Sequence, residues 1–258
     1  MVCGACPPPY NRAMDEMVGP TTLGASPGLM SEAGIERPFA WWGPLGRPVQ
    51  AHGLDDLVAG GVLPASLATL LGEAVERGVS LAVVAGPSGA GKTTLLSALL
   101  ESLPAATRRI HIRGCYEPFD FWREPEPPET ETILLVNEIS AHLPVYLWGP
   151  GVRRVLQAGL AGYHLAATAH AFSAQEFVAS LAGYPLRVPL AEIAALELVI
   201  ALDAWRDGAE VSREVREVTA LQATGQGLTS RELAIRPHRG APMRLDRAGW
   251  DELLARPG

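Results

Sequence analysis

The chain carries one stretch from which its architecture can be inferred, Gly86-Pro87-Ser88-Gly89-Ala90-Gly91-Lys92-Thr93-Thr94. It fits the pattern G-x-x-x-x-G-K-[ST], a phosphate-binding loop or P-loop. The apolar residues 79–85 before it predict a buried strand, and leucines at 95, 96, 99 and 100 follow it with helical spacing. A P-loop requires this strand–loop–helix context, so we interpret the match as functional and not as chance in a chain rich in Gly and Ala.

The residue types of this loop suit a phosphate. Glycines let the backbone wrap closely around an anion, and the positive N-terminal end of the following helix faces the same anion. We expect Lys92 to reach the β- and γ-phosphates of a nucleotide and the Thr93 hydroxyl to hold Mg²⁺. The chain has 21 Lys and Arg residues, and Lys92 is its single lysine. The predicted cofactors are therefore ATP and Mg²⁺, bound by residues 86–94.

Composition narrows the class of protein. The 258 residues are 48% hydrophobic and carry a net charge of −7 without a basic block, so a specific nucleic-acid partner is not indicated. No apolar run reaches about 18 residues, and no signal-peptide pattern opens the chain, which predicts a cytoplasmic protein without a membrane span. Cys3 and Cys6 form a single C-x-x-C without the second pair that a zinc site needs, and we interpret them as incidental.

Four parts follow one another along the chain. Residues 1–36, rich in Pro, Gly and Ser, predict a disordered leader. Residues 37–53 form a short arm whose Trp41 and Trp42 pack on the main domain or contact another subunit. Residues 54–225 are the predicted core, and residues 226–258 a polar tail ending in a short helix near 251–255.

The core alternates helices with apolar strands. Helices are expected at residues 54–58, 64–77, 92–103, 149–160 and 173–181, and strands at residues 79–85, 109–113, 133–136, 163–168, 196–202 and 211–218. Residues 114–131 are an acidic loop judged too polar for the core. The alternation predicts an α/β fold with a mostly parallel sheet and a C-terminal antiparallel hairpin.

Four stretches resemble, in the same order, the type II/IV secretion ATPase superfamily, particularly its pilus-assembly and conjugation branches. They are GLDDLVAGGVLPASLATLLGEAVERGVSLAVVAGPSGAGKTTLLSALL at 53–100, TILLVNEIS at 132–140, AGLAGYHLAATAHAFSAQE at 158–176 and LELVIALDAWRDGAEVSREVREVTAL at 196–221. The resemblance implies a RecA-like ATPase core, a hexameric ring, and docking on an inner-membrane platform protein of a secretion or pilus system, peripheral to the membrane.

The sequence departs from that family in several places. Asn137 replaces the family's Gly before the Walker B Glu, and Ser140-Ala141 replaces the Arg-Asp after it. The segment from Glu138 to Gly162 is several residues longer than usual, and the region before residue 54 is too short for the family's separate N-terminal domain. The chain therefore resembles a shortened, divergent member whose nucleotide binding is better supported than its turnover.

Three residues are candidate catalytic groups. Glu138 ends a buried strand, where it can polarise the attacking water or hold the hydration shell of Mg²⁺; its alternative role is capping the next helix. By resemblance, His170 senses the γ-phosphate or contacts the next subunit; its alternative is a structural histidine. Glu117 matches the family's acidic box loosely, and a solvated acidic loop explains it equally well. Thr168 is expected to hydrogen-bond Glu138 across neighbouring strand ends.

An arginine finger, often supplied by a neighbouring subunit, accelerates phosphoryl transfer. The sequence offers five candidates without choosing among them: Arg37, Arg47, Arg108, Arg109 and Arg113. His164 is interpreted as structural, and His111 is given no role.

Two functions remain in view. The first is a motor-type ATPase of a secretion or type IV pilus-like system. The alternative is a P-loop regulatory or assembly protein with weak or lost hydrolysis, which the missing Arg-Asp favours. A small-molecule kinase ranks lower, because its lid needs clustered arginines and residues 114–131 are acidic.

Overall fold

The computed structural model describes residues 52–123, 132–143, 146–207, 210–225 and 227–256. The predictions for residues 1–36, for nearly all of the arm at 37–53, and for Cys3, Cys6, Arg37 and Arg47 fall outside these ranges.

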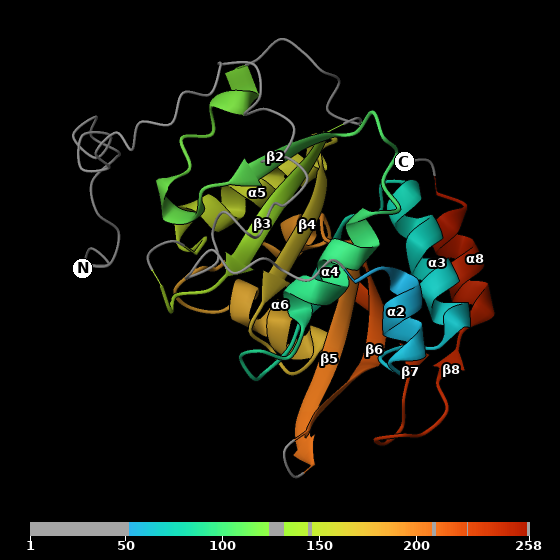
Figure 1. The fold of residues 1–258 in the computed structure, drawn as a ribbon. Coiled ribbons are helices and arrows are strands. Elements are labelled where there is room, and N and C mark those ends of the chain that lie inside the picture. The colour runs from blue at the N-terminus through green and yellow to red at the C-terminus, as the bar shows by residue number, and fades with distance from the viewer. Residues whose placement is uncertain (1–51, 124–131, 144–145, 208–209, 226, 257–258) are drawn as a thin grey trace, which may run out of the picture.

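One eight-stranded sheet runs through the molecule in the order β2-β3-β4-β1-β5-β6-β7-β8. The first five of these pair in parallel, and the last three continue the sheet with antiparallel pairing (Figure 1). The expected α/β fold, mostly parallel with antiparallel C-terminal strands, is thus confirmed. The strands are β1 (Leu81–Val84), β2 (Arg108–Ile112), β3 (Thr132–Ile139), β4 (His164–Ala169), β5 (Leu198–Asp207), β6 (Glu210–Thr224), β7 (Gly227–Ile235) and β8 (Arg244–Leu245).

Helices cover both faces of this sheet. Strand β1 is buried on both sides: Leu81 and Val83 face one core cluster, and Ala82 and Val84 face the other. In Figure 1, α2, α3, α4 and α8 group on one side, whereas α5 and α6 lie on the other. The helices are α2 (Leu54–Ala59), α3 (Ala65–Glu76), α4 (Lys92–Leu100), α5 (Pro150–Leu160), α6 (Ala174–Ala182), α7 (Leu190–Ile193) and α8 (Arg247–Leu254). Within the described ranges, no helix has the length and apolar character to cross a membrane.

Local sequence explains where two helices start and stop. Ser173 caps α6 as predicted, accepting a hydrogen bond from the Glu176 amide at 3.0 Å. Gly78 follows α3 with a φ of 79°, a left-handed conformation that favours glycine. A Cβ at this position would lie 2.3 Å from the His164 ring. His164, interpreted as structural, therefore packs directly against the turn that ends α3.

The C-terminal region differs from the prediction of a polar tail with only a short helix. Strands β7 and β8 extend the sheet, and α8 packs against β7. Trp250 of α8 is fully buried, and its Nε1 donates to the Leu233 carbonyl at 3.1 Å. The prediction failed because β7 is polar along most of its length, so it lacks the alternation that reveals a half-buried strand.

The acidic loop also differs in part. Its described residues include two short 3₁₀ turns, η2 (Gly114–Tyr116) and η3 (Asp120–Arg123). Phe121 in the second turn is buried and meets Tyr163 edge-to-face at 5.3 Å between ring centroids. The view that this loop stays outside the core is wrong for Phe121, because a single aromatic ring can anchor an otherwise polar segment.

Candidate functional site

The P-loop leaves the end of β1 and enters the start of α4 through glycines that its backbone requires. Gly91 has a φ of 93° and immediately precedes Lys92, the first residue of α4. At Gly86, a Cβ would lie 2.1 Å from the ring of Phe172, so a larger residue would displace that ring. Among the described residues, no side chain caps the start of α4. Its first amides are therefore available to an anion.

A cavity of about 600 Å³ opens over this loop, a size typical of small-molecule sites. Residues 88–95 form one wall, while Gly86 and Pro87 do not line it. Residues from several other parts of the chain also line it, among them Asp56, Leu57, Glu138, Tyr146, His170, Leu202 and Arg213.

Lys92 lies at the base of the cavity. It is only 7% exposed, and its Nζ is 3.5 Å from Nδ1 of His170. Burial lowers the pKa of Lys92 below its ordinary value, and the nearby Glu138 carboxylate opposes that shift. A buried cation in this setting is stabilised by any anion that enters the cavity.

Glu138 lies one residue before the end of β3, beside a register shift in the β3–β4 pairing. The residue is 9% exposed, and its Oε1 lies 2.7 Å from Nε2 of His170. That oxygen is buried, and no well-directed hydrogen-bond donor reaches it from the described residues. The segment around Leu147 continues the pairing, because the Leu147 amide donates to the Glu138 carbonyl at 2.9 Å.

His170 follows β4 and connects the P-loop to β3. Its Nδ1 lies 3.2 Å from the Gly86 carbonyl oxygen, and its Nε2 faces Glu138. Because β4 lies between β1 and β3, the carboxyl ends of these parallel strands meet at one edge of the sheet. The structure thus brings together three residues that the sequence had singled out: Lys92, Glu138 and His170.

Thr168 does not make the expected contact. Its hydroxyl donates to the carbonyl of Asn137, whereas the Glu138 carboxylate faces His170. The prediction of a Thr168–Glu138 hydrogen bond is therefore wrong. Val136 pairs with Ala167, so Asn137 lies opposite Thr168, and Glu138 falls in the register shift that precedes the Ile139–Ala169 pair.

Glu117 does not line the cavity. Its two carboxylate oxygens accept hydrogen bonds from the amides of Arg113 (2.8 Å) and Phe119 (3.0 Å), so it closes its own turn.

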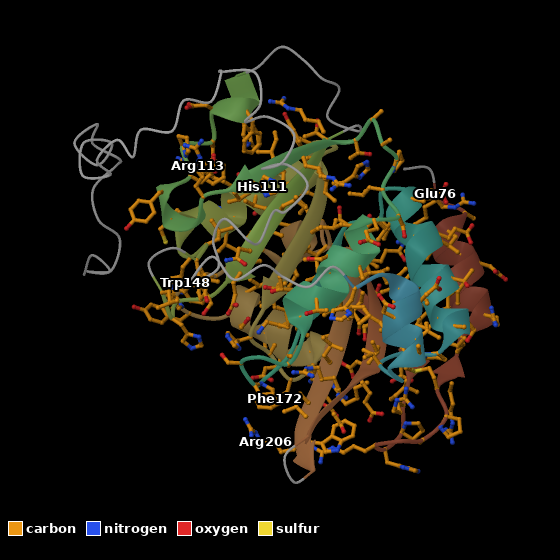
Figure 2. All side chains as sticks on the ribbon, in the orientation of Figure 1. Glu76, His111, Arg113, Trp148, Phe172 and Arg206 are labelled. Carbon is orange, nitrogen blue, oxygen red and sulfur yellow. The ribbon has the colours of Figure 1, made fainter. Side chains whose placement is uncertain are left out.

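The candidate arginine fingers in the described residues lie away from the P-loop. Figure 2 shows Arg113 well away from Phe172, the residue whose ring covers Gly86. Arg108 and Arg109 also lie outside the cavity, and Arg109 donates to the Leu100 carbonyl at 3.2 Å.

Three residues that contact the predicted site residues or change their electrostatics were not singled out from the sequence. Arg213 of β6 donates from Nε and from its terminal nitrogen to the Gly89 carbonyl, both at 3.3 Å. Tyr146 lines the cavity, where burial and then the charge of Glu138 raise the pKa of its hydroxyl. The ring of His142 lies 5.1 Å from that of His170, edge-on. The one available signal was the extra length after Glu138, which supplies both His142 and Tyr146.

No family model and no curated protein matches the sequence. Among solved structures, the chain is similar to the VirB11 ATPase from the Brucella suis type IV secretion system, determined in complex with sulphate. The identity is 20% and the TM-score 0.44, over 64% of this chain and 54% of that one. This is a distant structural resemblance. The chain spans about half the length of that protein.

Proposed function

We propose that this protein binds Mg·ATP at residues 86–94 and hydrolyses it to ADP and phosphate. The observation that carries the proposal is the placement of Lys92, Glu138 and His170 around one P-loop cavity, at the meeting point of three parallel strand ends. A buried lysine and the open N-terminus of α4 suit the phosphates, and a buried carboxylate suits a reacting water.

The binding step follows from the loop. Residues 88–92 line the cavity, and their amides together with the Lys92 ammonium would bind the phosphates. Thr93 lies in the first turn of α4, where its hydroxyl would hold Mg²⁺. Mg²⁺ held by the Thr93 hydroxyl would supply positive charge that offsets the negative charge developing on the phosphates. Arg213, held against the Gly89 carbonyl, adds a cation at the rim of the cavity.

The hydrolytic step is assigned to Glu138. Its carboxylate orients a water molecule and accepts a proton from it as the water attacks the γ-phosphate. Nε2 of His170 lies beside this carboxylate, and the Gly86 carbonyl lies beside the other ring nitrogen of His170. The His170 ring therefore lies between the P-loop backbone and the hydrolytic carboxylate and is close to both.

The biological setting is proposed from the four motif stretches and their order. It is a motor-type ATPase of a secretion or type IV pilus-like system, acting as a hexameric ring against a membrane platform protein on the cytoplasmic side. Arg108, Arg109 and Arg113 lie outside the cavity of their own subunit. If one of these arginines is an arginine finger, it acts on the nucleotide of a neighbouring subunit.

A second function is favoured by Ser140 and Ala141, which replace the family's Arg-Asp after Glu138. It is a nucleotide-binding assembly or regulatory protein with little turnover. Purified protein separates the two, with ATP affinity and phosphate release measured over a range of protein concentrations and compared with Lys92→Ala. Release above that of Lys92→Ala supports the ATPase. Tight ATP binding with no excess release at any concentration supports the second function.

A further inference from the structure

We propose that Glu138, His142 and His170 bind a divalent transition-metal ion of the Zn²⁺ class. Their ligand atoms, one from each side chain, lie within 4.8 Å of one another. The site goes beyond the ATPase proposal, although the two share Glu138 and His170. Its ligands also differ in kind from those of the Mg²⁺ that accompanies ATP, because Mg²⁺ prefers oxygen ligands and imidazoles suit zinc and its neighbours.

The Glu138 carboxylate has a buried oxygen that suits a cation. Its Oε1 is buried and only 2.7 Å from Nε2 of His170, yet no hydrogen bond of acceptable direction joins them. A buried carboxylate oxygen without a donor is costly. A cation along the lone-pair direction of Nε2 would contact this oxygen from the side and would satisfy both groups.

The orientation of the His170 ring makes one of its nitrogens available to the same cation. Nδ1 has two neighbours, the Gly86 carbonyl oxygen at 3.2 Å and Lys92 Nζ at 3.5 Å. The carbonyl is nearer and can only accept, so we assign an N–H to Nδ1. That tautomer leaves Nε2 as a free ligand facing Glu138. Metal-binding histidines commonly donate their other N–H to a backbone carbonyl in this way. Lys92 lies on the Nδ1 side, so the ring separates its charge from the proposed ion.

His142 supplies the third ligand. It lies on the segment after β3, where its amide donates to Ser140 Oγ at 3.1 Å, and its side chain is exposed. Its ring stands edge-on to His170 at an interplanar angle of 64°. Ligands of a tetrahedral zinc ion lie roughly 3.3 Å apart. On binding, the 2.7 Å Glu138–His170 pair would therefore open and the His142 side chain would rotate toward it. Glu138, His142 and His170 would supply three ligands. Because His142 is exposed, water can reach the fourth position.

The test uses the full-length chain without nucleotide. Cys3→Ser and Cys6→Ser are introduced together as a background, because two thiols are themselves zinc ligands. Zn²⁺ binding is measured by equilibrium dialysis, and Co²⁺ binding by its visible absorption. In this background, His142→Ala is compared with His238→Ala, since His238 is an exposed histidine outside the cluster. Circular dichroism confirms that both variants are folded.

We expect one Zn²⁺ per chain in the background protein and in His238→Ala. His142→Ala should lower the affinity by about 10- to 100-fold, because even partners of direct ligands have effects of this size. X-ray absorption should report two imidazoles on the ion. Equal affinity of His142→Ala and His238→Ala, or no stoichiometric binding in the background, overturns the proposal. ATP binding is measured separately, so failure of the metal site and failure of the ATPase proposal are distinguishable.

Discussion

Nε2 of His170 lies 2.7 Å from Oε1 of Glu138, and this contact joins the ends of two neighbouring parallel strands beside the P-loop. The opposite nitrogen of the same ring lies near the Gly86 carbonyl and the Lys92 ammonium. One imidazole therefore touches the phosphate-binding loop, its lysine and the proposed hydrolytic carboxylate. The proposed ATPase activity and the proposed metal site both depend on this arrangement.

Replacing the carboxylate of Glu138 tests its role in hydrolysis. Glu138→Gln keeps the shape of the side chain but removes the proton acceptor, so phosphate release should fall by about a hundredfold or more. ATP affinity should change little, because the P-loop is untouched. Glu76→Gln serves as a control, since Glu76 is exposed at the end of α3 and lies away from the cavity (Figure 2). Normal turnover in Glu138→Gln would assign the water to another residue.

The lowered pKa of Lys92 predicts a pH dependence of ATP affinity. Burial favours the neutral amine, so without ligand Lys92 loses its proton below the ordinary pKa of 10.5. Phosphates bind the ammonium form, and ATP affinity should therefore fall as the pH rises toward 10.5, starting earlier than for an exposed lysine. Binding should be accompanied by proton uptake in the same range, measured by calorimetry in buffers of different ionisation enthalpy.

A Lys92→Met variant provides the control for this titration. Its affinity should be low, and it should not show the fall with pH. A parallel fall in Lys92→Met and in the unmodified protein would assign the titration to another group.

Alanine substitutions at two glycines with similar backbone angles can distinguish the cost of conformational strain from the cost of steric overlap. Gly61 and Gly78 have φ values of 72° and 79°. A Cβ at Gly61 meets no atom within 4 Å, whereas one at Gly78 meets the His164 ring at 2.3 Å. Gly61→Ala should lower the free energy of unfolding by about 1 to 2 kcal/mol from strain alone. Gly78→Ala should lower it by roughly 1 to 3 kcal/mol more, measured by urea denaturation. Equal costs would show that the His164 ring moves aside freely.

The sequence could predict the central part of the site because it follows from local patterns. Lys92 belongs to a recognisable loop, and Glu138 and His170 each come at or just after the end of an apolar strand. Parallel strands place their carboxyl ends at one edge, so the proximity of these residues follows from the fold class. No long-range register has to be known for this inference.

The remaining residues depend on pairing between distant segments. Arg213 reaches the Gly89 carbonyl through the register of β5 with β6, and Tyr146 reaches the cavity because its segment pairs with the end of β3. No local motif predicts either of these pairings. Glu117 is the opposite case. Its position in the sequence resembles a motif, but in the structure two backbone amides hold its carboxylate within its own turn.

Trp250 tests whether the C-terminal strands and α8 are integral to the fold. The side chain is fully buried with the core cluster of α3 and α4, and its Nε1 donates to Leu233 of β7. Trp250→Ala should lower the free energy of unfolding by about 3 to 5 kcal/mol, because it leaves a large cavity in the core. Trp122→Ala should cost no more than about 1 kcal/mol, since Trp122 is 45% exposed. Both are measured by denaturant unfolding. Equal, small costs would mean that α8 is only loosely attached, and a large effect of Trp250→Ala alone would make residues 227–254 part of the cooperative core.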